Sequence, residues 1–435
     1  MGENRTGRCL WLFAALAGLL VLVAGCSTND DGETKKNAEE VLKFVWWGGD
    51  QRKENTLKVI ELFEKANPGV KIEAVPLSNT SDVSKEAVMG YGRGEAPDII
   101  QGDYGFIFNF INRKLFEPLD TYAENGALDL TDVESEFLAP GRAADGKLYA
   151  VNLGNNSQTF LINTKVFADT KIELLQDGYT LDDLYATLKE MKARNKTPGF
   201  APLGAMIDMT YYMRARGVSL YNSEGTGLGY QDDQIMADYL RLQKKWTDEG
   251  LIYKGGSVSN NKNHPLVTGL TAIYPVVTNQ AATISSFTSD SLKLIHYPVI
   301  DPKYEGKFLK PSMFLSVSAY SKHKEAAAKF ISFFINNPEA NDILNGERGV
   351  PVATKIAARL FAKQNAANQE QYLYIENLKT QVKPIDPPVP SSSTSVNNAY
   401  NRVKNKVLAG TITPEEGAAE YRSDAAKILN RGRAE

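Results

Sequence analysis

The globular part of the chain opens with a strand, a helix and a second strand in close succession. Residues 41–47 form a β-rich apolar run that ends at a Gly-Gly pair, and apolar residues then recur at helical spacing over 57–66. An Asn-Pro-Gly turn at 67–69 stops that helix, and residues 71–75 alternate as a second strand. A strand, a crossover helix and a returning strand form a right-handed βαβ unit, which predicts a parallel sheet and an α/β fold.

Strand and helix patterns continue along the chain without a repeat of fixed period. Further strands are predicted at 98–101, 149–153, 159–163, 270–277 and 291–300, and further helices at 106–115, 181–195, 233–250, 323–336 and over most of 397–429. A Pro-rich and Ser-rich stretch at 387–395 is predicted to be a hinge or crossing loop. A chain of 435 residues is longer than one hydrophobic core usually organises, so two or more lobes are expected.

The first 26 residues have the three parts of a bacterial export signal. Two arginines precede an apolar run at 10–24, and Val-Ala-Gly leads into Cys26. Small residues before the cysteine fit a peptidase cleft, and the tetrapeptide resembles the lipobox of bacterial lipoproteins. We expect a signal peptide at 1–25, a lipid on Cys26 and a polar tether at 26–40, which would place the protein on the extracytoplasmic face of the cell membrane.

Three alternatives to a lipoprotein signal have less support. An apolar run of roughly 15 residues is too short to cross a bilayer comfortably, and no basic residue follows at once to stop transfer. Gly2 and Thr6 also fit the pattern for N-myristoylation, which leaves the apolar run unexplained. A disulfide from Cys26 has only Cys9 as a partner, inside the segment to be removed.

Charge and metal-ligand content exclude several function classes. The formal net charge is −3, so no strong basic field invites nucleic acid. His264, His296 and His323 are the only histidines and lie outside any zinc-spacing motif, so neither a metal site nor a cofactor is expected. The P-loop and nucleophile-elbow motifs are absent. A surface glycosidase or polysaccharide lyase, which needs only a pair of carboxylates, remains the enzyme alternative.

Four segments spread over the chain carry a family resemblance. They are FVWWGGDQR at 44–52 with its helix and Asn-Pro-Gly stop, GEAPDIIQ at 94–101, DGKLYAV at 145–151 running on to 162–163, and the helix at 326–334 followed by GVP at 349–351. Together they resemble the extracellular solute-binding proteins of bacterial ABC importers, in the branch of maltose-binding protein and related oligosaccharide receptors. The resemblance implies an α/β, two-lobed periplasmic-binding-protein fold of type II, each lobe a mixed, mostly parallel sheet flanked by helices.

On this plan, lobe 1 would take 41–153 and 312–380, and lobe 2 would take 154–311 and 381–435. The resemblance implies a monomeric binding protein, not an enzyme, which closes over a solute and offers it to the permease subunits of an importer. The Trp-Trp-Gly-Gly loop is similar to that of receptors for plant cell-wall oligosaccharides, some of them uronides. A peptide, a polyamine or a metal complex is the alternative ligand, although tryptophans and neutral amides favour sugar.

Candidate ligand contacts begin where the first strand ends, at the edge of the sheet that faces the cleft. The side chains of Trp46 and Trp47 point to opposite faces of the strand. One should therefore point into the packing layer and the other toward the cleft, where an indole can stack on sugar C–H groups. Asp50 could accept hydrogen bonds from hydroxyls or cap the following helix. Arg52 could fork onto hydroxyls or a carboxylate, or remain a solvated residue of the first helical turn.

Polar residues after later strands extend the predicted site. Asp103 and Tyr104 follow the strand at 98–101, where related receptors place polar and aromatic contacts. Asn156 and Gln158 lie two apart on an extended segment, hence on one face. Their amides offer donors and acceptors to a hydroxyl-rich ligand, or else bond the backbone of a crossing.

The second lobe offers further candidates. Asn279 and Gln280 follow a predicted strand, at a place where many relatives carry a tryptophan platform that this chain lacks. Tyr211 or Tyr212 could supply the missing aromatic stack, or be ordinary half-buried tyrosines. Met313 is a candidate near the third crossing, although methionine more often fills a core.

Overall fold

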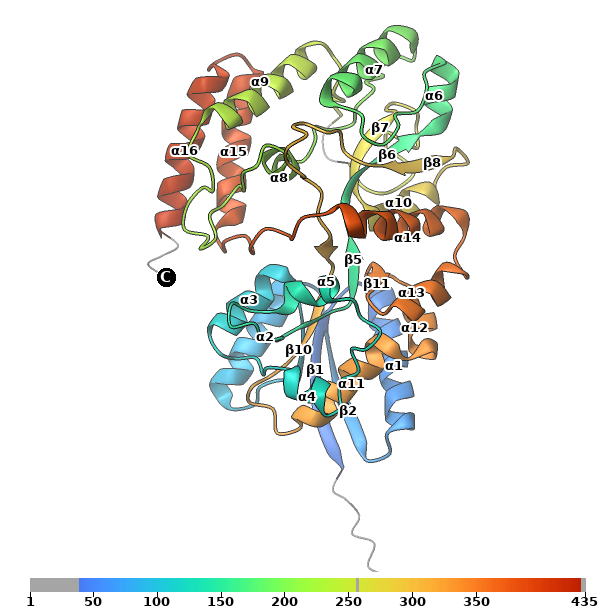
Figure 1. Ribbon diagram of the computed structural model, residues 1–435, viewed down its shortest axis with the longest axis vertical. Coiled ribbons are helices and arrows are strands. Elements are labelled where there is room, and N and C mark those ends of the chain that lie inside the picture. The colour runs from blue at the N-terminus through green and yellow to red at the C-terminus, as the bar shows by residue number, and fades with distance from the viewer. Residues whose placement is uncertain (1–38, 256–257, 432–435) are drawn as a thin grey trace, which may run out of the picture. The chain divides into compact units, whose positions relative to one another are not determined.

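The computed structural model describes residues 39–255 and 258–431, which form an α/β body with three sheets (Figure 1). The predicted signal peptide, Cys26 and nearly all of the tether lie outside the described residues. Among the helices of the described part, none has the length and apolar content that a bilayer crossing requires.

Lobe 1 is built on a five-stranded sheet with strand order β2-β1-β3-β10-β4. Its strands are β1 (Glu40–Trp47), β2 (Val70–Leu77), β3 (Ile99–Gly102), β4 (Val151–Asn152) and β10 (Phe314–Val317). β1 pairs in parallel with β2 and β3, whereas β10 is antiparallel to β3 and β4. The predicted strand–helix–strand opening with a parallel sheet is confirmed.

Alternation along β1 divides lobe 1 into two packing layers. The helices of this lobe are α1 (Asp50–Ala66), α2 (Thr80–Arg93), α3 (Tyr104–Asn112), α4 (Asp120–Glu124), α5 (Ser135–Leu138), α11 (Lys324–Asn336), α12 (Pro338–Leu344) and α13 (Thr354–Phe361). Leu42, Phe44 and Trp46 pack with α1 and α11, whereas Val45 packs with α2 and α3. Figure 1 shows these two helix layers on opposite sides of the sheet.

Lobe 2 is built on a three-stranded sheet with strand order β7-β6-β8. Its elements are β6 (Gln158–Asn163), β7 (Ile273–Val277), β8 (Leu292–Ile295), α6 (Thr164–Thr170), α7 (Leu181–Arg194), α8 (Met209–Arg214), α9 (Gln234–Asp248), α10 (Thr278–Ser285), α15 (Ser393–Leu408) and α16 (Pro414–Arg431). β6 is antiparallel to both neighbours, so lobe 2 departs from the expectation of a mostly parallel sheet, whereas the lobe 1 sheet is mixed. An alternating pattern predicts the faces of a strand but not its direction, which is why the sequence did not reveal this difference.

A small third sheet carries the chain between the lobes. It consists of β5 (Gly154–Asn156), β9 (Lys310–Pro311) and β11 (Val350–Pro351), in the order β11-β5-β9. β5 continues into β6 through a single residue, Ser157. The helix α14 (Ala366–Leu378) packs on α10 and β8 of lobe 2 and on α13 and β11. α14 therefore contacts both lobes, and the predicted lobe boundary at residue 380 stays a prediction.

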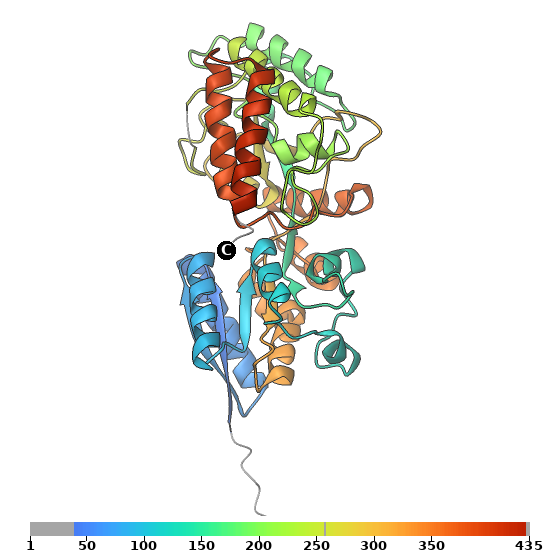
Figure 2. The ribbon, with the colours of Figure 1, turned by 90° about the vertical axis from the view of Figure 1, so that its left-hand side faces the viewer.

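The last two helices pack against each other and against α9, as Figure 2 shows. They confirm the helical prediction for 397–429, with a turn between them at 409–413. The segment 382–392 before them is irregular, in agreement with a crossing loop, although α15 already begins at Ser393. This segment matters for the site because it forms part of the cavity wall described below.

Candidate functional site

A cavity of about 440 Å³, the main cavity, is lined by residues of both lobes beside the strand crossings. Its wall consists of Asp103, Tyr104, Gly105, Gln158, Thr210, Arg214, Phe308, Lys310, Pro311, Ser312, Ile385, Asp386, Pro387 and Val389. The volume lies in the usual range for small-molecule sites, about 300 to 1,000 Å³. Apolar surface with a few convergent polar groups is the composition that such sites share.

A second cavity of about 360 Å³, the side cavity, adjoins the main cavity at Tyr104 and Ile385, which line both. Its other wall residues are Glu136, Ala139, Pro140, Asn155, Leu309, Lys379, Val382, Lys383 and Pro384. The two cavities are therefore adjacent, with Tyr104 and Ile385 in the walls of both.

Asp103 and Tyr104, two of the predicted ligand contacts, both line the main cavity. Asp103 is also the N-cap of α3, because its Oδ1 accepts a hydrogen bond of 2.8 Å from the Phe106 amide. The Tyr104 ring stacks on Phe314 with centroids 6.2 Å apart. Burial raises the pKa of Tyr104 to about 12, and the charge of Asp386 acts in the same direction. The phenol therefore stays neutral and can both donate and accept a hydrogen bond.

The structure does not bring Asn156 and Gln158 together. Gln158 lines the main cavity, and its Oε1 is buried without a hydrogen-bond partner. Asn156 lines neither cavity; its Oδ1 accepts from Thr278 Oγ1 at 3.4 Å and from Gln371 Nε2 at 3.3 Å. The strand is interrupted at Ser157, where the chain leaves the small sheet for the lobe 2 sheet. The Asn156 side chain thus bonds side chains of α10 and α14, and not the backbone of a crossing as the alternative expected.

The two tryptophans have different environments, as the alternation of β1 predicts. Trp46 is fully buried and stacks on Phe44, with ring centroids 4.8 Å apart, so it is a core residue and not a ligand contact. Trp47 is partly exposed and packs against the hydrophobic cluster that also supports Tyr104. Neither tryptophan lines the main cavity or the side cavity. Trp47 is the one that packs against the same hydrophobic cluster as Tyr104.

Arg52 and Asp50 differ from their predicted roles. Arg52 Nε donates to Glu347 Oε2 at 2.9 Å, and its Nη1 lies 3.4 Å from the Trp47 carbonyl oxygen. Asp50 is exposed and is the first residue of α1, while Gly49 is the N-cap, so Asp50 does not cap the helix. Arg52 therefore holds the loop after β1 against Glu347 and lines neither cavity.

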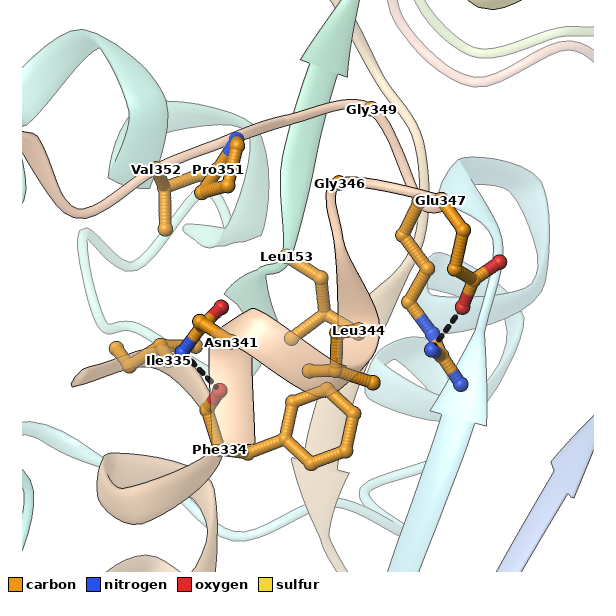
Figure 3. A pocket seen from close by; sticks show the side chains of 11 residues that line it. Leu153, Phe334, Ile335, Asn341, Leu344, Gly346, Glu347, Gly349, Pro351 and Val352 are labelled. Atoms are coloured by element: carbon orange, nitrogen blue, oxygen red, sulfur yellow. Dashed lines mark hydrogen bonds and ion pairs between the residues drawn. The ribbon is translucent and has the colours of Figure 1, made fainter. Parts of the chain in front are cut away.

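Glu347 is shared with a second arginine, Arg348, which is buried. Arg348 Nη1 bonds Glu347 Oε1, and its Nε donates to Gln101 Oε1 at 3.1 Å. Figure 3 shows Glu347 and Phe334 at a small pocket here, and the Arg348 guanidinium lies 5.3 Å from the Phe334 ring centroid. Burial lowers the pKa of Arg348 to about 10, so the side chain is still charged at neutral pH.

This network also reaches the loop of Trp47. Gln101 Nε2 donates to the Trp47 carbonyl oxygen at 3.2 Å, and Arg348 Nη2 donates to Thr56 Oγ1 at 3.0 Å. The ends of β1 and β3 are thereby fixed to each other and to α1. Sequence reasoning missed this network because Arg52 and Glu347 are separated by 295 positions along the chain.

A second arginine network lies in the wall of the main cavity. Arg214, at the end of α8, is buried and bonds the Asp386 carboxylate, and its Nη2 donates to the Pro384 carbonyl oxygen at 2.9 Å. Ser219 Oγ donates to the same Asp386 oxygen at 3.1 Å. The guanidinium lies 5.0 Å from the Phe308 ring centroid. These contacts hold the irregular 382–392 segment in the cavity wall.

Tyr211 and Tyr212 do not form the predicted aromatic platform. Both are buried in the lobe 2 core, and the Tyr211 hydroxyl donates to the Pro298 carbonyl oxygen at 3.0 Å. Burial raises the pKa of both tyrosines. The short helix α8 is covered on several sides, which explains why consecutive residues are both buried. Phe308, which the sequence pattern did not single out, is the lobe 2 aromatic residue in the main cavity wall.

The three remaining candidates also lie outside both cavities. Gln280 Oε1 accepts a hydrogen bond of 2.8 Å from the Val277 amide at the start of α10, and Asn279 is exposed beside it. Met313 is partly buried against the lobe 1 core, in the filling role that is usual for methionine. Within the described residues, no group of three or more His, Cys, Asp or Glu side chains is arranged to hold a metal ion.

Two α/β lobes, joined by short crossing strands with a cavity at the crossing, define a solute receptor of the periplasmic type. Residues 49–341 match the bacterial extracellular solute-binding protein family, and this span is more than half of the chain. The chain belongs to this family and is accordingly a binding protein and not an enzyme.

Individual relatives show the same fold at low sequence identity. A family 1 solute-binding protein of Alicyclobacillus acidocaldarius is 24% identical, with a TM-score of 0.78 over 90% of this chain and 99% of that chain. An oligogalacturonide-binding protein of Yersinia enterocolitica, solved with saturated digalacturonic acid, is 22% identical, with a TM-score of 0.71 over 91% and 100%. An ABC transporter extracellular-binding protein of Pyrococcus horikoshii is 24% identical over 196 residues, 42% of this chain and 43% of that relative. The match thus spans less than half the length of this curated relative.

Proposed function

We propose that the protein captures an oligosaccharide in the main cavity and delivers it to the permease of an ABC importer. One observation carries the proposal: Gln158 Oε1 and Ser312 Oγ are buried at this cavity without a hydrogen-bond partner. A buried polar atom left unpaired costs about 1 to 3 kcal/mol. A ligand rich in hydroxyl groups would supply the missing partners, because a hydroxyl both donates and accepts.

Apolar surface beside these atoms supports the same ligand class. Tyr104, Phe308, Pro311 and Ile385 line the main cavity together with the two unpaired polar atoms. A sugar ring has C–H faces as well as hydroxyl groups. It therefore matches a wall that contains both apolar rings and polar atoms without a hydrogen-bond partner. A polyamine would instead require several free carboxylates, whereas Asp386 is already bonded to Arg214.

Acidic oligosaccharides derived from plant cell walls are the first sugars to test. Lys310 lines the main cavity and Lys383 lines the side cavity, and neither ammonium group belongs to an ion pair within the described residues. A uronide carboxylate would pair with such a lysine. The Yersinia enterocolitica protein, which shares the fold and was solved with saturated digalacturonic acid, also supports this choice.

The test is a thermal-shift panel with di- and trigalacturonic acid beside cello-, xylo- and malto-oligosaccharides at millimolar concentration. A ligand at 100 times its Kd stabilises the folded state by about 2.7 kcal/mol, which raises the melting temperature by a few degrees. Gln158→Leu should abolish the shift, whereas Gln176→Leu, at an exposed glutamine outside the main and side cavities, should keep it. A protein that responds to a polyamine or a peptide mixture but to no sugar would contradict the proposal.

The lipid anchor is a separate part of the proposal. Cys26, the expected lipidation site, would tether the receptor close to its transporter while the polar segment 26–40 lets it move. Cys26→Ala should shift the protein from the membrane fraction to the soluble fraction and leave its ligand affinity unchanged. Retention of the variant in the membrane fraction would show that another element holds the protein there.

A further inference from the structure

Asn155 presents a hydrogen-bond donor for which the described part of the chain provides no acceptor. Its side chain is 1% exposed, and its Nδ2 has no hydrogen-bond partner. Its Oδ1 is occupied, because Asn152 Nδ2 donates to it at 2.9 Å. Asn152 is fixed in turn, since its own Oδ1 accepts from the Gly154 amide at 3.2 Å. The Asn155 amide therefore has one orientation, in which the free edge is the donor.

The position of Asn155 places this donor beside the side cavity. Asn155 lies on β5 opposite Pro311 of β9, and it lines the side cavity together with Pro140 and Lys383. The side cavity and the main cavity share Tyr104 and Ile385 in their walls, so the two cavities are adjacent.

A structural role accounts for only half of the Asn155 amide. The crossing uses the Oδ1 atom, and Nδ2 has no acceptor among the described residues. The buried Nδ2 costs free energy in the unliganded protein, since a polar group without a partner has lost its hydration. The donor is therefore best explained by a partner that arrives with the ligand.

We propose that the side cavity is a second sugar subsite and that Asn155 is its fixed hydrogen-bond donor. This inference rests on the proposed function, because it assigns a second ring to the same ligand. The ligand is then an oligosaccharide of at least two rings, with one ring in the main cavity and the next one beyond Tyr104. The volumes of about 440 and 360 Å³ are each within the range of a small-molecule site.

Two variants test the subsite in independent ways. Asn155→Asp keeps the Oδ1 acceptor for Asn152 and replaces the donor with a charged acceptor. Ala139→Trp fills the side cavity from an exposed position in a short 3₁₀ turn, where a larger side chain does not disturb a core. Ala139→Ser is the matched control that leaves the cavity open. Urea unfolding of each variant shows whether it folds as the wild type does.

The measurement is titration calorimetry with galacturonic acid and its dimer and trimer, and with glucose, maltose and maltotriose as the neutral series. The wild type should bind the disaccharide of one series at least about tenfold more tightly than its monosaccharide. Asn155→Asp and Ala139→Trp should each reduce that ratio to about twofold or less while the monosaccharide affinity stays unchanged. Ala139→Ser should retain the full ratio.

The possible failures are distinguishable. Equal affinity of the wild type for one ring and two, or an unchanged ratio in Ala139→Trp, would overturn the subsite and leave the proposed function intact. A normal ratio in Asn155→Asp with a lost ratio in Ala139→Trp would overturn the role of Asn155. Absence of binding to every member of both series and to every sugar of the thermal-shift panel would overturn the proposed oligosaccharide function and the subsite with it.

Discussion

Two buried arginines, Arg348 in lobe 1 and Arg214 in lobe 2, have similar environments but different roles. They are 4% and 8% exposed, and each lies over a phenylalanine ring, at 5.3 and 5.0 Å. Each bonds a carboxylate and further acceptors. The carboxylate of Glu347 lies outside both cavities and is shared with Arg52, whereas the carboxylate of Asp386 lies in the wall of the main cavity.

The difference shows that the same kind of buried arginine network can serve two purposes. In lobe 1, the network ties the ends of β1 and β3 together through Gln101, so its contribution is to the shape of the lobe. In lobe 2, Arg214 holds the segment 382–392, which forms neither a strand nor a helix. We therefore expect damage to the Arg348 network to appear mainly as lost stability, and damage to the Arg214 network mainly as lost affinity.

The largest effect is expected for Glu347→Gln. This change leaves the fully buried Arg348 without its carboxylate and also removes the partner of Arg52. Breaking a buried ion pair from one side typically destabilises by about 3 to 5 kcal/mol, because the remaining charge is left uncompensated. Urea unfolding should show a loss of this size.

The control is Glu54→Gln, which removes an exposed carboxylate paired with Lys58 on the surface of α1. Exposed pairs of this kind contribute little to stability, so the unfolding midpoint should hardly move. A similar midpoint in both variants would mean that the Arg348 network does not stabilise lobe 1.

The second prediction concerns Arg214→Met. The variant loses the bonds to Asp386 and Pro384 but keeps an apolar stem over Phe308. We expect affinity for the oligosaccharide to fall by at least about tenfold, because the cavity wall formed by 382–392 is no longer fixed. The free energy of unfolding should fall by about 2 kcal/mol, the scale of hydrogen bonds to charged groups.

Arg241→Met is the matched control for Arg214→Met. Arg241 is an exposed arginine on α9 that pairs with Asp238 and Glu415, away from both cavities. Its replacement should leave affinity unchanged. If Arg214→Met lost stability like Glu347→Gln and kept its affinity, the two networks would have the same role and the comparison would fail.

Local sequence patterns predicted the parts of the fold that are determined locally. The strands and the helix between 40 and 77 follow from alternation, helical spacing and an Asn-Pro-Gly stop, and the structure has all three. The helix α14 was not predicted, because its apolar residues are interspersed with polar ones that contact two lobes. The direction of β6 was also beyond reach, since pairing depends on strands that are far apart in the chain.

The candidate site was predictable to a similar degree. Asp103 and Tyr104 were found because they follow a short apolar strand, and Gln158 because it is a neutral amide on an extended segment. Arg214 and Asp386 are 172 positions apart, and no local pattern joins them. Asn155 was missed because only its bond to Asn152 shows which edge of the amide is free.

The third prediction extends the comparison of the lobes to the dependence of stability on acidic pH. Lobe 2 buries His264 against Tyr274 of β7, with ring centroids 4.6 Å apart, and burial lowers the pKa of His264 to about 4. An unfolded histidine has a pKa of about 6.5, so between pH 6.5 and 4 the unfolded chain binds more protons than the folded one. Stability is therefore present above this window and falls as the pH decreases through it, by at most about 1.4 kcal/mol per pH unit.

Urea unfolding at pH 7, 6 and 5 measures this slope. His264→Gln should reduce the pH dependence, whereas His323→Gln, at a partly exposed position beside α11, should keep the slope of the wild type. An unchanged slope in His264→Gln would mean that other groups cause the acid sensitivity, among them His296 of lobe 2, whose pKa is also lowered by burial.

The smallest effect is predicted for Ser312→Ala, and its two parts have opposite signs. The Ser312 hydroxyl is buried at the main cavity without a partner, so its removal should leave the unliganded protein equally stable or more stable by up to about 1 kcal/mol. Affinity should fall about fivefold, the loss of roughly one ligand hydrogen bond.

Ser316→Ala supplies the matched control for Ser312→Ala. Ser316 Oγ is also buried without a partner, but it lies within β10 and lines neither cavity. Its replacement should give the same gain in stability with no change in affinity. Equal binding by both variants would show that the unpaired atoms are a general feature of this fold, and the ligand would then have to be recognised by the charged groups at the main cavity, Lys310 and the Arg214–Asp386 pair.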